Sequence, residues 1–96
     1  MILKLVIKEE AYYDLQTVYD YYEEKRHGLG DEFIEEIKEK LEYIKKHPLH
    51  FNKVEKEFRQ TLIDRFPYLL IYEFSGKEVI VYSFFHTSQN PEKKYK

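Results

Sequence analysis

The sequence contains no cysteine, no tryptophan and only three glycines among its 96 residues. Without cysteine the chain can form no disulfide, no thiolate metal site and no thiol nucleophile, and this composition fits a reducing cytoplasm. The glycines stand at positions 28, 30 and 76, so no glycine-rich phosphate loop is present. These absences argue against nucleotide hydrolysis, and they leave metal binding to four histidines that lack metal-ligand spacing.

Long apolar runs are also absent. The first ten residues, MILKLVIKEE, hold a short apolar segment that Lys4 interrupts and that acids follow. We therefore expect neither a signal peptide nor a membrane span here, but a first strand over residues 2–7. Hydrophobic residues make up 43% of the chain, which is enough for one core, so residues 1–96 are predicted to form a single domain.

A strong positive charge is missing as well. The formal net charge is −2, with 8 Lys and Arg against 12 Asp and Glu in residues 1–50, and 8 against 6 in residues 51–96. Proteins that bind nucleic acid usually carry a basic field, because neutralising phosphates supplies most of their non-specific affinity. The tail residues Lys93, Lys94 and Lys96 could form a local basic patch, although a lysine-rich terminus more often serves solubility.

Two helices are predicted by apolar residues that recur at intervals of three and four. They are Ala11, Leu15, Val18 and Tyr22 in a helix from Glu9 to about His27, and Phe33, Ile37, Leu41 and Ile44 in a helix from about Asp31 to Lys46. Gly28 favours a stop after the first helix and Pro48 after the second. The short connection predicts an antiparallel hairpin whose apolar side covers a sheet.

Three further strands are predicted at about residues 57–64, 68–74 and 79–85, and residues 47–56 are expected to form a loop. Ser75-Gly76-Lys77 is typical of a hairpin turn between the last two strands. The predicted fold class is therefore α+β, with the order β-α-α-β-β-β and an antiparallel sheet packed by an N-terminal helical hairpin.

Short motifs in a characteristic order give this chain a family resemblance. They are Ala11-x-x-Asp14-Leu15, Tyr21-Tyr22, Leu29 through Phe33, Pro48, Arg59, Phe66-Pro67-Tyr68, Ile71-Tyr72, Phe85-His86 and Asn90-Pro91. With this order the chain resembles the RelE/ParE superfamily of bacterial toxins from type II toxin–antitoxin modules, also known as plasmid stabilisation systems. It is more similar to the ParE-like branch than to the ribonuclease branch.

The resemblance implies a cytoplasmic toxin that binds and poisons DNA gyrase, without a catalytic residue, cofactor or metal. It also implies a cognate antitoxin protein. The expected assembly is a toxin homodimer or a heterotetramer of toxin and antitoxin. The residues predicted to bind partners are Tyr68, Tyr72, Tyr82, Asn90, Lys93 and Lys94. On the sheet, the surface for the antitoxin is expected to be Tyr68, Leu70 and Tyr72, or Ile80, Tyr82 and Phe84, depending on which face the helices cover.

An alternative function within the superfamily is ribosome-dependent cleavage of messenger RNA. This reaction needs a general base, a general acid and cations near the phosphate, and Arg59, Arg65 and His86 are the candidate catalytic residues, with Tyr82 beside them. Ribonuclease relatives usually carry an arginine where this chain has Tyr68 and an aromatic residue where it has Thr87. A second alternative is a non-toxic family remnant that only binds its antitoxin.

Each candidate also has a structural interpretation. Arg59 is expected to form an ion pair with a helix carboxylate such as Glu36 or Asp14, and His86 to form a hydrogen-bonded strand end. The acids around Asp14 are explained by the preference of helix N-termini for negative charge and by solvated helix faces. Most of the five tyrosines in the first helix are expected to pack within the hairpin.

Overall fold

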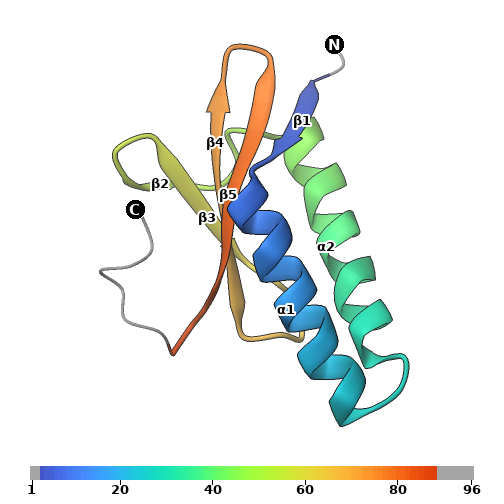
Figure 1. Cartoon of the computed structure of the whole chain (residues 1–96). Coiled ribbons are helices and arrows are strands. Elements are labelled where there is room, and N and C mark those ends of the chain that lie inside the picture. The colour runs from blue at the N-terminus through green and yellow to red at the C-terminus, as the bar shows by residue number, and fades with distance from the viewer. Residues whose placement is uncertain (1–2, 89–96) are drawn as a thin grey trace.

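The computed structural model describes residues 3–88 of the chain. Its elements are β1 (Lys4–Ile7), α1 (Glu9–Lys25), α2 (Leu29–Lys46), β2 (Lys53–Glu55), β3 (Phe58–Leu62), β4 (Tyr68–Ser75) and β5 (Glu78–His86) (Figure 1). The strands form one sheet in the order β1-β5-β4-β3-β2. The predicted α+β class and the succession of a strand, two helices and a series of strands are confirmed.

The sheet differs from the prediction in two respects. The segment expected to be a loop contains the short edge strand β2, which pairs antiparallel with β3 through an irregular register. β1 pairs parallel with β5, so the sheet is mixed rather than wholly antiparallel. A parallel pair needs a long crossover connection, and the helical hairpin together with β2, β3 and β4 supplies it.

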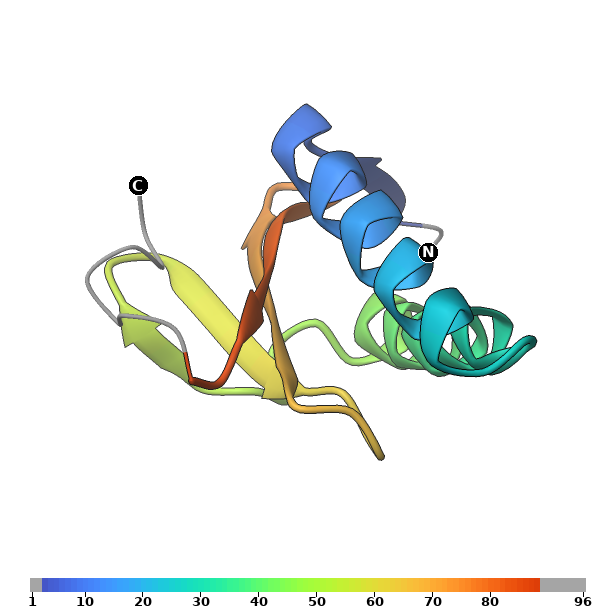
Figure 2. The same cartoon turned by 60° about the horizontal axis from the view of Figure 1, so that its bottom comes forward.

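Both helices lie on the same side of the sheet, as Figure 2 shows. The buried core between them and the sheet includes Phe33, Ile37, Leu41 and Ile44 from α2 and Leu70, Tyr72, Val79 and Val81 from the strands. Along α1, Ala11 and Val18 are buried, whereas Leu15 and Tyr22 are partly buried against this core. The apolar stripes predicted from the sequence are therefore the faces that pack on the sheet.

Glu23 joins the two helices of the hairpin. Its carboxylate accepts hydrogen bonds from the main-chain N–H groups of Gly28 at 3.1 Å, Gly30 at 2.9 Å and Asp31 at 3.3 Å. These groups belong to the first turn of α2, where main-chain donors have no partner within the helix. The hydrogen bond from Gly28, the largest of several causes, lowers the pKa of the Glu23 carboxyl. Glu23 thus caps α2 from the neighbouring helix.

Gly30 permits this close approach. A Cβ atom at position 30 would lie 2.8 Å from the main-chain oxygen of Tyr19 and 2.8 Å from Cγ of Glu23. Only glycine leaves room for the start of α2 against α1. Beyond the hairpin, the rings of Tyr22, Phe33 and Phe66 meet at centroid distances of 5.0 to 5.7 Å, and they connect the helices to the β3–β4 turn.

Candidate functional site

A cavity of about 160 Å³ lies between α1 and the end of β5. Its walls are Asp14, Thr17 and Val18 of α1, Tyr68 of β4, and Phe84 and His86 of β5. Tyr68 and His86 are paired in the β4–β5 ladder, and α1 packs on β5, so residues distant in the sequence meet here. The cavity brings a carboxylate, an imidazole and two hydroxyl side chains together.

A β-bulge in β5 determines which side chains reach this cavity. The ladder pairs Tyr72 with Val81 but then Ile71 with Ser83, so Tyr82 is the extra residue on β5. A bulge interrupts the regular alternation of side chains between the two faces of a strand. The residues after Tyr82 therefore lie on the face opposite to the one that unbroken alternation predicts.

The bulge corrects one of the sequence predictions. Ile80, Tyr82 and Phe84 were expected to share a face, but Phe84 pairs with Leu70 in the ladder and is buried in the core with it. His86 follows Phe84 by two residues and lines the cavity on the helix side. Without the bulge, both would lie on the sheet face that the helices do not cover.

Asp14 contributes the carboxylate of the cavity. Its Oδ2 atom accepts a hydrogen bond of 3.1 Å from the main-chain N–H of Phe84, across 70 positions of sequence. Burial raises the pKa of the Asp14 carboxyl; the hydrogen bond from Phe84 opposes this shift, and the nearby charge of Glu10 adds to it. Asp14 is thus not one of the solvated acids that the sequence suggested, and it connects α1 to β5.

The contacts of His86 include a neighbouring ring and the segment that follows β5. Its ring meets the ring of Tyr68 edge to face, with the centroids 5.0 Å apart. Its Nδ1 atom accepts a hydrogen bond of 3.0 Å from the main-chain N–H of Ser88. In the neutral ring the proton is therefore on Nε2, because a nitrogen that accepts a hydrogen bond carries none. Burial is the largest cause that raises the pKa of the Tyr68 hydroxyl.

Arg59 is positioned by the chain itself. Its Nη1 atom donates a hydrogen bond of 2.6 Å to the main-chain oxygen of Phe51, which fixes the segment before β2 against β3. The expected ion pair of Arg59 with Glu36 or Asp14 is not among the ion pairs of the described residues. Glu36 is bound by Arg65 instead, at 3.7 Å.

Arg65 connects the β3–β4 turn to α2. Its Nη2 atom lies 2.6 Å from Oε1 of Glu32, and its guanidinium group lies over the ring of Phe66. Glu32 also binds Arg26 at 2.8 Å, and the hydrogen bonds from these two arginines lower the pKa of its carboxyl. Arg65 itself adopts a left-handed backbone conformation with φ of 71°, which the tight turn requires.

The three predicted catalytic residues do not converge on one cavity. Arg59 pairs with Tyr72 in the β3–β4 ladder, four residues along β4 from the Tyr68 that faces His86. Four residues of a strand span about 13 Å at ~3.3 Å each. Of the three, His86 alone lines the Asp14 cavity. The cavity residues Asp14 and Thr17 were not among the predicted site residues.

The residues predicted to bind partners occupy different environments. Tyr68 is partly buried in the cavity, whereas Tyr72 is fully buried and donates a hydrogen bond of 3.0 Å to the main-chain oxygen of Pro48. Tyr72 therefore offers no surface to a partner in this fold. Tyr82 lies on the sheet face away from the helices, where it donates to Glu73 at 2.8 Å. Asn90, Lys93 and Lys94 lie outside the described residues.

Exposed tyrosines on α1 contradict the expectation that most would pack within the hairpin. Tyr12 is 58% exposed, Tyr13 68% and Tyr21 51%. Tyr13, Thr17 and Tyr21 recur every fourth residue, so they form one stripe along the helix. Thr17 lines the cavity, and this stripe therefore passes its opening. In the sequence, the only feature of residues 3–88 that we find to indicate this surface is the spacing of eight positions between Tyr13 and Tyr21.

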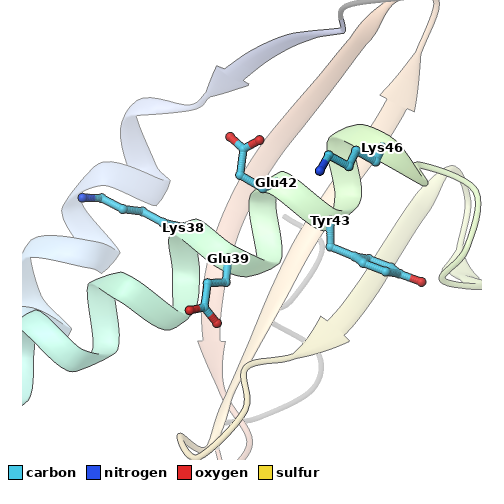
Figure 3. A pocket seen from close by; sticks show the side chains of 5 residues that line it. All are labelled: Lys38, Glu39, Glu42, Tyr43 and Lys46. Carbon is cyan, nitrogen blue, oxygen red and sulfur yellow. The ribbon is translucent and has the colours of Figure 1, made fainter.

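A larger depression of about 390 Å³ follows the solvent side of α2 (Figure 3). It is lined by Lys38, Glu39, Glu42, Tyr43 and Lys46. Figure 3 shows that these side chains leave a single helix in different directions. Because no polar groups converge in it, this depression is a weaker candidate than the smaller cavity around Asp14.

The described residues also limit two other kinds of site. Among residues 3–88, no group of three or more His, Cys, Asp or Glu side chains is placed to hold a metal ion. Neither helix in this part of the chain combines the length and the apolar character that a membrane crossing requires.

The sequence matches a family model and the fold matches a solved structure. A family model described as "ParE toxin of type II toxin-antitoxin system, parDE" matches residues 5–91. A solved structure described as "Chromosomal ParDE TA system from P. aeruginosa" matches with a TM-score of 0.79 and 16% sequence identity, over 91% of this chain and 98% of that one. At this identity the structural match supports the fold alone. No curated protein matches the chain.

Proposed function

This chain belongs to the family of ParE toxins of type II toxin–antitoxin systems, and from this premise we propose that it stops growth by binding DNA gyrase and trapping the cleaved-DNA state. The observation that carries the proposal is the family match over residues 5–91. An inhibitor of this kind acts through a surface and needs no general acid or base. The proposal places its action in the cytoplasm, where gyrase works.

The placement of the arginines supports binding over RNA cleavage. Cleaving RNA requires cations next to the phosphate. Arg59 is bound to the main-chain oxygen of Phe51, and Arg65 to the carboxylates of Glu32 and Glu36. Both guanidinium groups are thus engaged in holding the fold together, and Asp14 adds a carboxylate beside His86 that would repel a phosphate.

An antitoxin partner follows from the same family. We propose that the cognate antitoxin covers the exposed tyrosine stripe of α1 and the opening of the Asp14 cavity. An exposed group of large aromatic residues is a typical interaction surface. Within the described residues, the edge strand β1 is longer and less charged than β2, so it is the better edge for an added partner strand.

The first experiment incubates the purified chain with gyrase, ATP and supercoiled plasmid, followed by detergent and protease. Linear DNA on a gel, increasing with the concentration of the chain, is the expected result. A reaction with the cognate antitoxin added in excess serves as the control and should give no linear DNA. Active gyrase that yields no linear DNA at any concentration would refute gyrase poisoning.

The ribonuclease alternative is kept because His86 shares a cavity with Asp14 and Tyr68, groups that could move protons. Growth arrest in cells that express His86→Gln separates the two functions. Gyrase poisoning predicts arrest equal to that of the wild type, whereas RNA cleavage predicts its loss. His27→Gln, at an exposed position on the hairpin, is the matched control. A chain that never slows growth would be the non-toxic remnant.

A further inference from the structure

The Asp14 carboxylate differs from two other acids of the helical hairpin, because no Lys or Arg of the described residues pairs with it and it accepts one main-chain hydrogen bond. Glu23 accepts three main-chain N–H groups, and Glu32 binds two arginines. Asp14 is partly buried, and among the described residues its hydrogen-bond donor is the main-chain N–H of Phe84. No ion pair among the described residues includes Asp14.

The cavity around this carboxylate opens beside exposed aromatic rings. Thr17 lines the cavity, and Tyr13 and Tyr21 stand one turn before it and one turn after it on α1. The ring face of Tyr21 accepts a cation, because Nζ of Lys25 lies 5.0 Å from its centroid. A positive side chain that approaches the cavity would therefore pass an aromatic surface before it reached the carboxylate.

We propose that the Asp14 cavity binds an arginine side chain of the antitoxin. This inference rests on the proposed function, because it assumes that an antitoxin covers α1. A guanidinium group is planar, can donate two parallel hydrogen bonds to a carboxylate and stacks on aromatic rings. It fits a cavity of about 160 Å³ whose lining includes the Asp14 carboxylate and the Tyr68 ring, with the exposed Tyr13 and Tyr21 one helical turn on either side of Thr17.

The same groups disfavour the other occupants. A phosphate would meet the Asp14 charge, and the cavity contains no Lys or Arg to offset it. An apolar side chain would exclude water from the partly exposed carboxylate without supplying a counter-charge, which is costly. A lysine could pair with Asp14, but as a compact and strongly hydrated charge it gains less from the tyrosine rings than a guanidinium group does.

The site can be tested with acetyl-arginine amide as the probe, titrated into the ¹⁵N-labelled chain and followed by NMR. We expect saturable shifts of the Phe84 amide signal, because its N–H is bound to Asp14. Acetyl-citrulline amide, which is neutral and nearly the same shape, should leave that signal in place. Equal shifts from both probes, or no shift from either, would overturn the proposal.

Two variants assign the effect to this cavity. Asp14→Asn keeps an oxygen that can accept the Phe84 N–H, and it should abolish the saturable shift. Asp20→Asn, an exposed acid on the same helix, should leave it unchanged. Tyr21→Ala should weaken the titration about threefold, the value of an exposed cation–π contact, and it tests the site even if Asp14→Asn fails to fold. Undiminished binding by Asp14→Asn contradicts the proposal.

Affinity for the cognate antitoxin provides the second measurement. Asp14→Asn should weaken the complex about 10- to 100-fold, which is near the lower end of the loss expected for a fully desolvated charge pair because Asp14 is only partly buried. Asp20→Asn should weaken it by less than about twofold. A wild-type chain that binds no antitoxin would contradict the proposed function, while the arginine titration would still decide whether the cavity is a site. Normal antitoxin affinity in Asp14→Asn would overturn the assignment.

Discussion

Replacing Gly30 with alanine should destabilise the protein, although the same change at most helical positions stabilises it. Alanine is favoured over glycine inside a helix by about 1 kcal/mol. At position 30, however, the new Cβ would stand 2.8 Å from the main-chain oxygen of Tyr19 and 2.8 Å from Cγ of Glu23. Carbon atoms essentially never approach a main-chain oxygen that closely, so α1 and α2 would have to separate.

The size of the effect follows from two opposing contributions. Extra atoms in a closely packed interior cost about 1–3 kcal/mol. Subtracting the gain of about 1 kcal/mol in helix propensity leaves a loss of about 0–2 kcal/mol in the free energy of unfolding. We expect the upper half of this range, about 1–2 kcal/mol, because one of the two atoms that the new Cβ meets is a main-chain oxygen that cannot rotate away. For a domain of this size, each kcal/mol lowers the melting temperature by about 4–8 °C. The separation would also disturb the hydrogen bonds from the first turn of α2 to Glu23.

Chemical denaturation monitored by circular dichroism measures this loss. The double variant Glu23→Ala, Gly30→Ala identifies its source, because removing the Glu23 side chain leaves the main-chain oxygen of Tyr19 in place. We expect little rescue in the double variant, since backbone cannot move aside as a side chain can. A Gly30→Ala protein as stable as the wild type, or more stable, would refute this account of the hairpin.

Two further predictions concern hydrogen bonds from or to the main chain that Glu23 and Tyr72 form. Glu23→Gln should reduce stability above pH 4.5. The difference in stability from the wild type should shrink as the pH falls, because a carboxyl whose pKa is lowered by folding stabilises the fold only while it is ionised. Urea denaturation at a series of acid pH values measures this difference. Tyr72→Phe should cost about 1 kcal/mol at neutral pH by leaving the oxygen of Pro48 without its donor. Burial raises the pKa of Tyr72 to about 12, so the wild type should lose stability as the pH rises from 10 towards 12. Tyr72→Phe has no hydroxyl to ionise and should lack that part of the loss. If the variant shows the full alkaline loss, the loss does not come from Tyr72.

The helices were predictable because local periodicity defines them. Apolar residues such as Val18 and Ile37 recur at helical intervals, and a helix can bury only one such face. The short strand β2 could not be found in this way. Its three residues Lys53, Val54 and Glu55 are all exposed, so no apolar alternation marks them, and the strand exists because β3 offers an edge for pairing.

The candidate site was less predictable because it depends on non-local contacts. The bulge at Tyr82 carries no glycine or proline that would reveal it, yet it sends Phe84 and His86 to the helix side. The partner of Asp14 lies 70 positions away, so sequence spacing gives no hint that this acid is partly buried whereas Glu9 and Glu10 are exposed. Periodicity reports which face of an element is apolar, but not which polar group that face will enclose.

The distribution of charge partners connects the two proposals. Arg59 and Arg65, two of the predicted catalytic residues, are bound to the protein's own oxygens, whereas the Asp14 carboxylate forms no ion pair within residues 3–88. Because these arginines are bound within the fold and the carboxylate forms no ion pair there, the surface around the Asp14 cavity is suited to a basic protein segment and not to a phosphate backbone. If arginine binding at Asp14 is established and gyrase poisoning persists in Asp14→Asn, neutralisation and toxicity must use separable surfaces. Loss of both in that variant would mean that antitoxin and target compete for the same cavity.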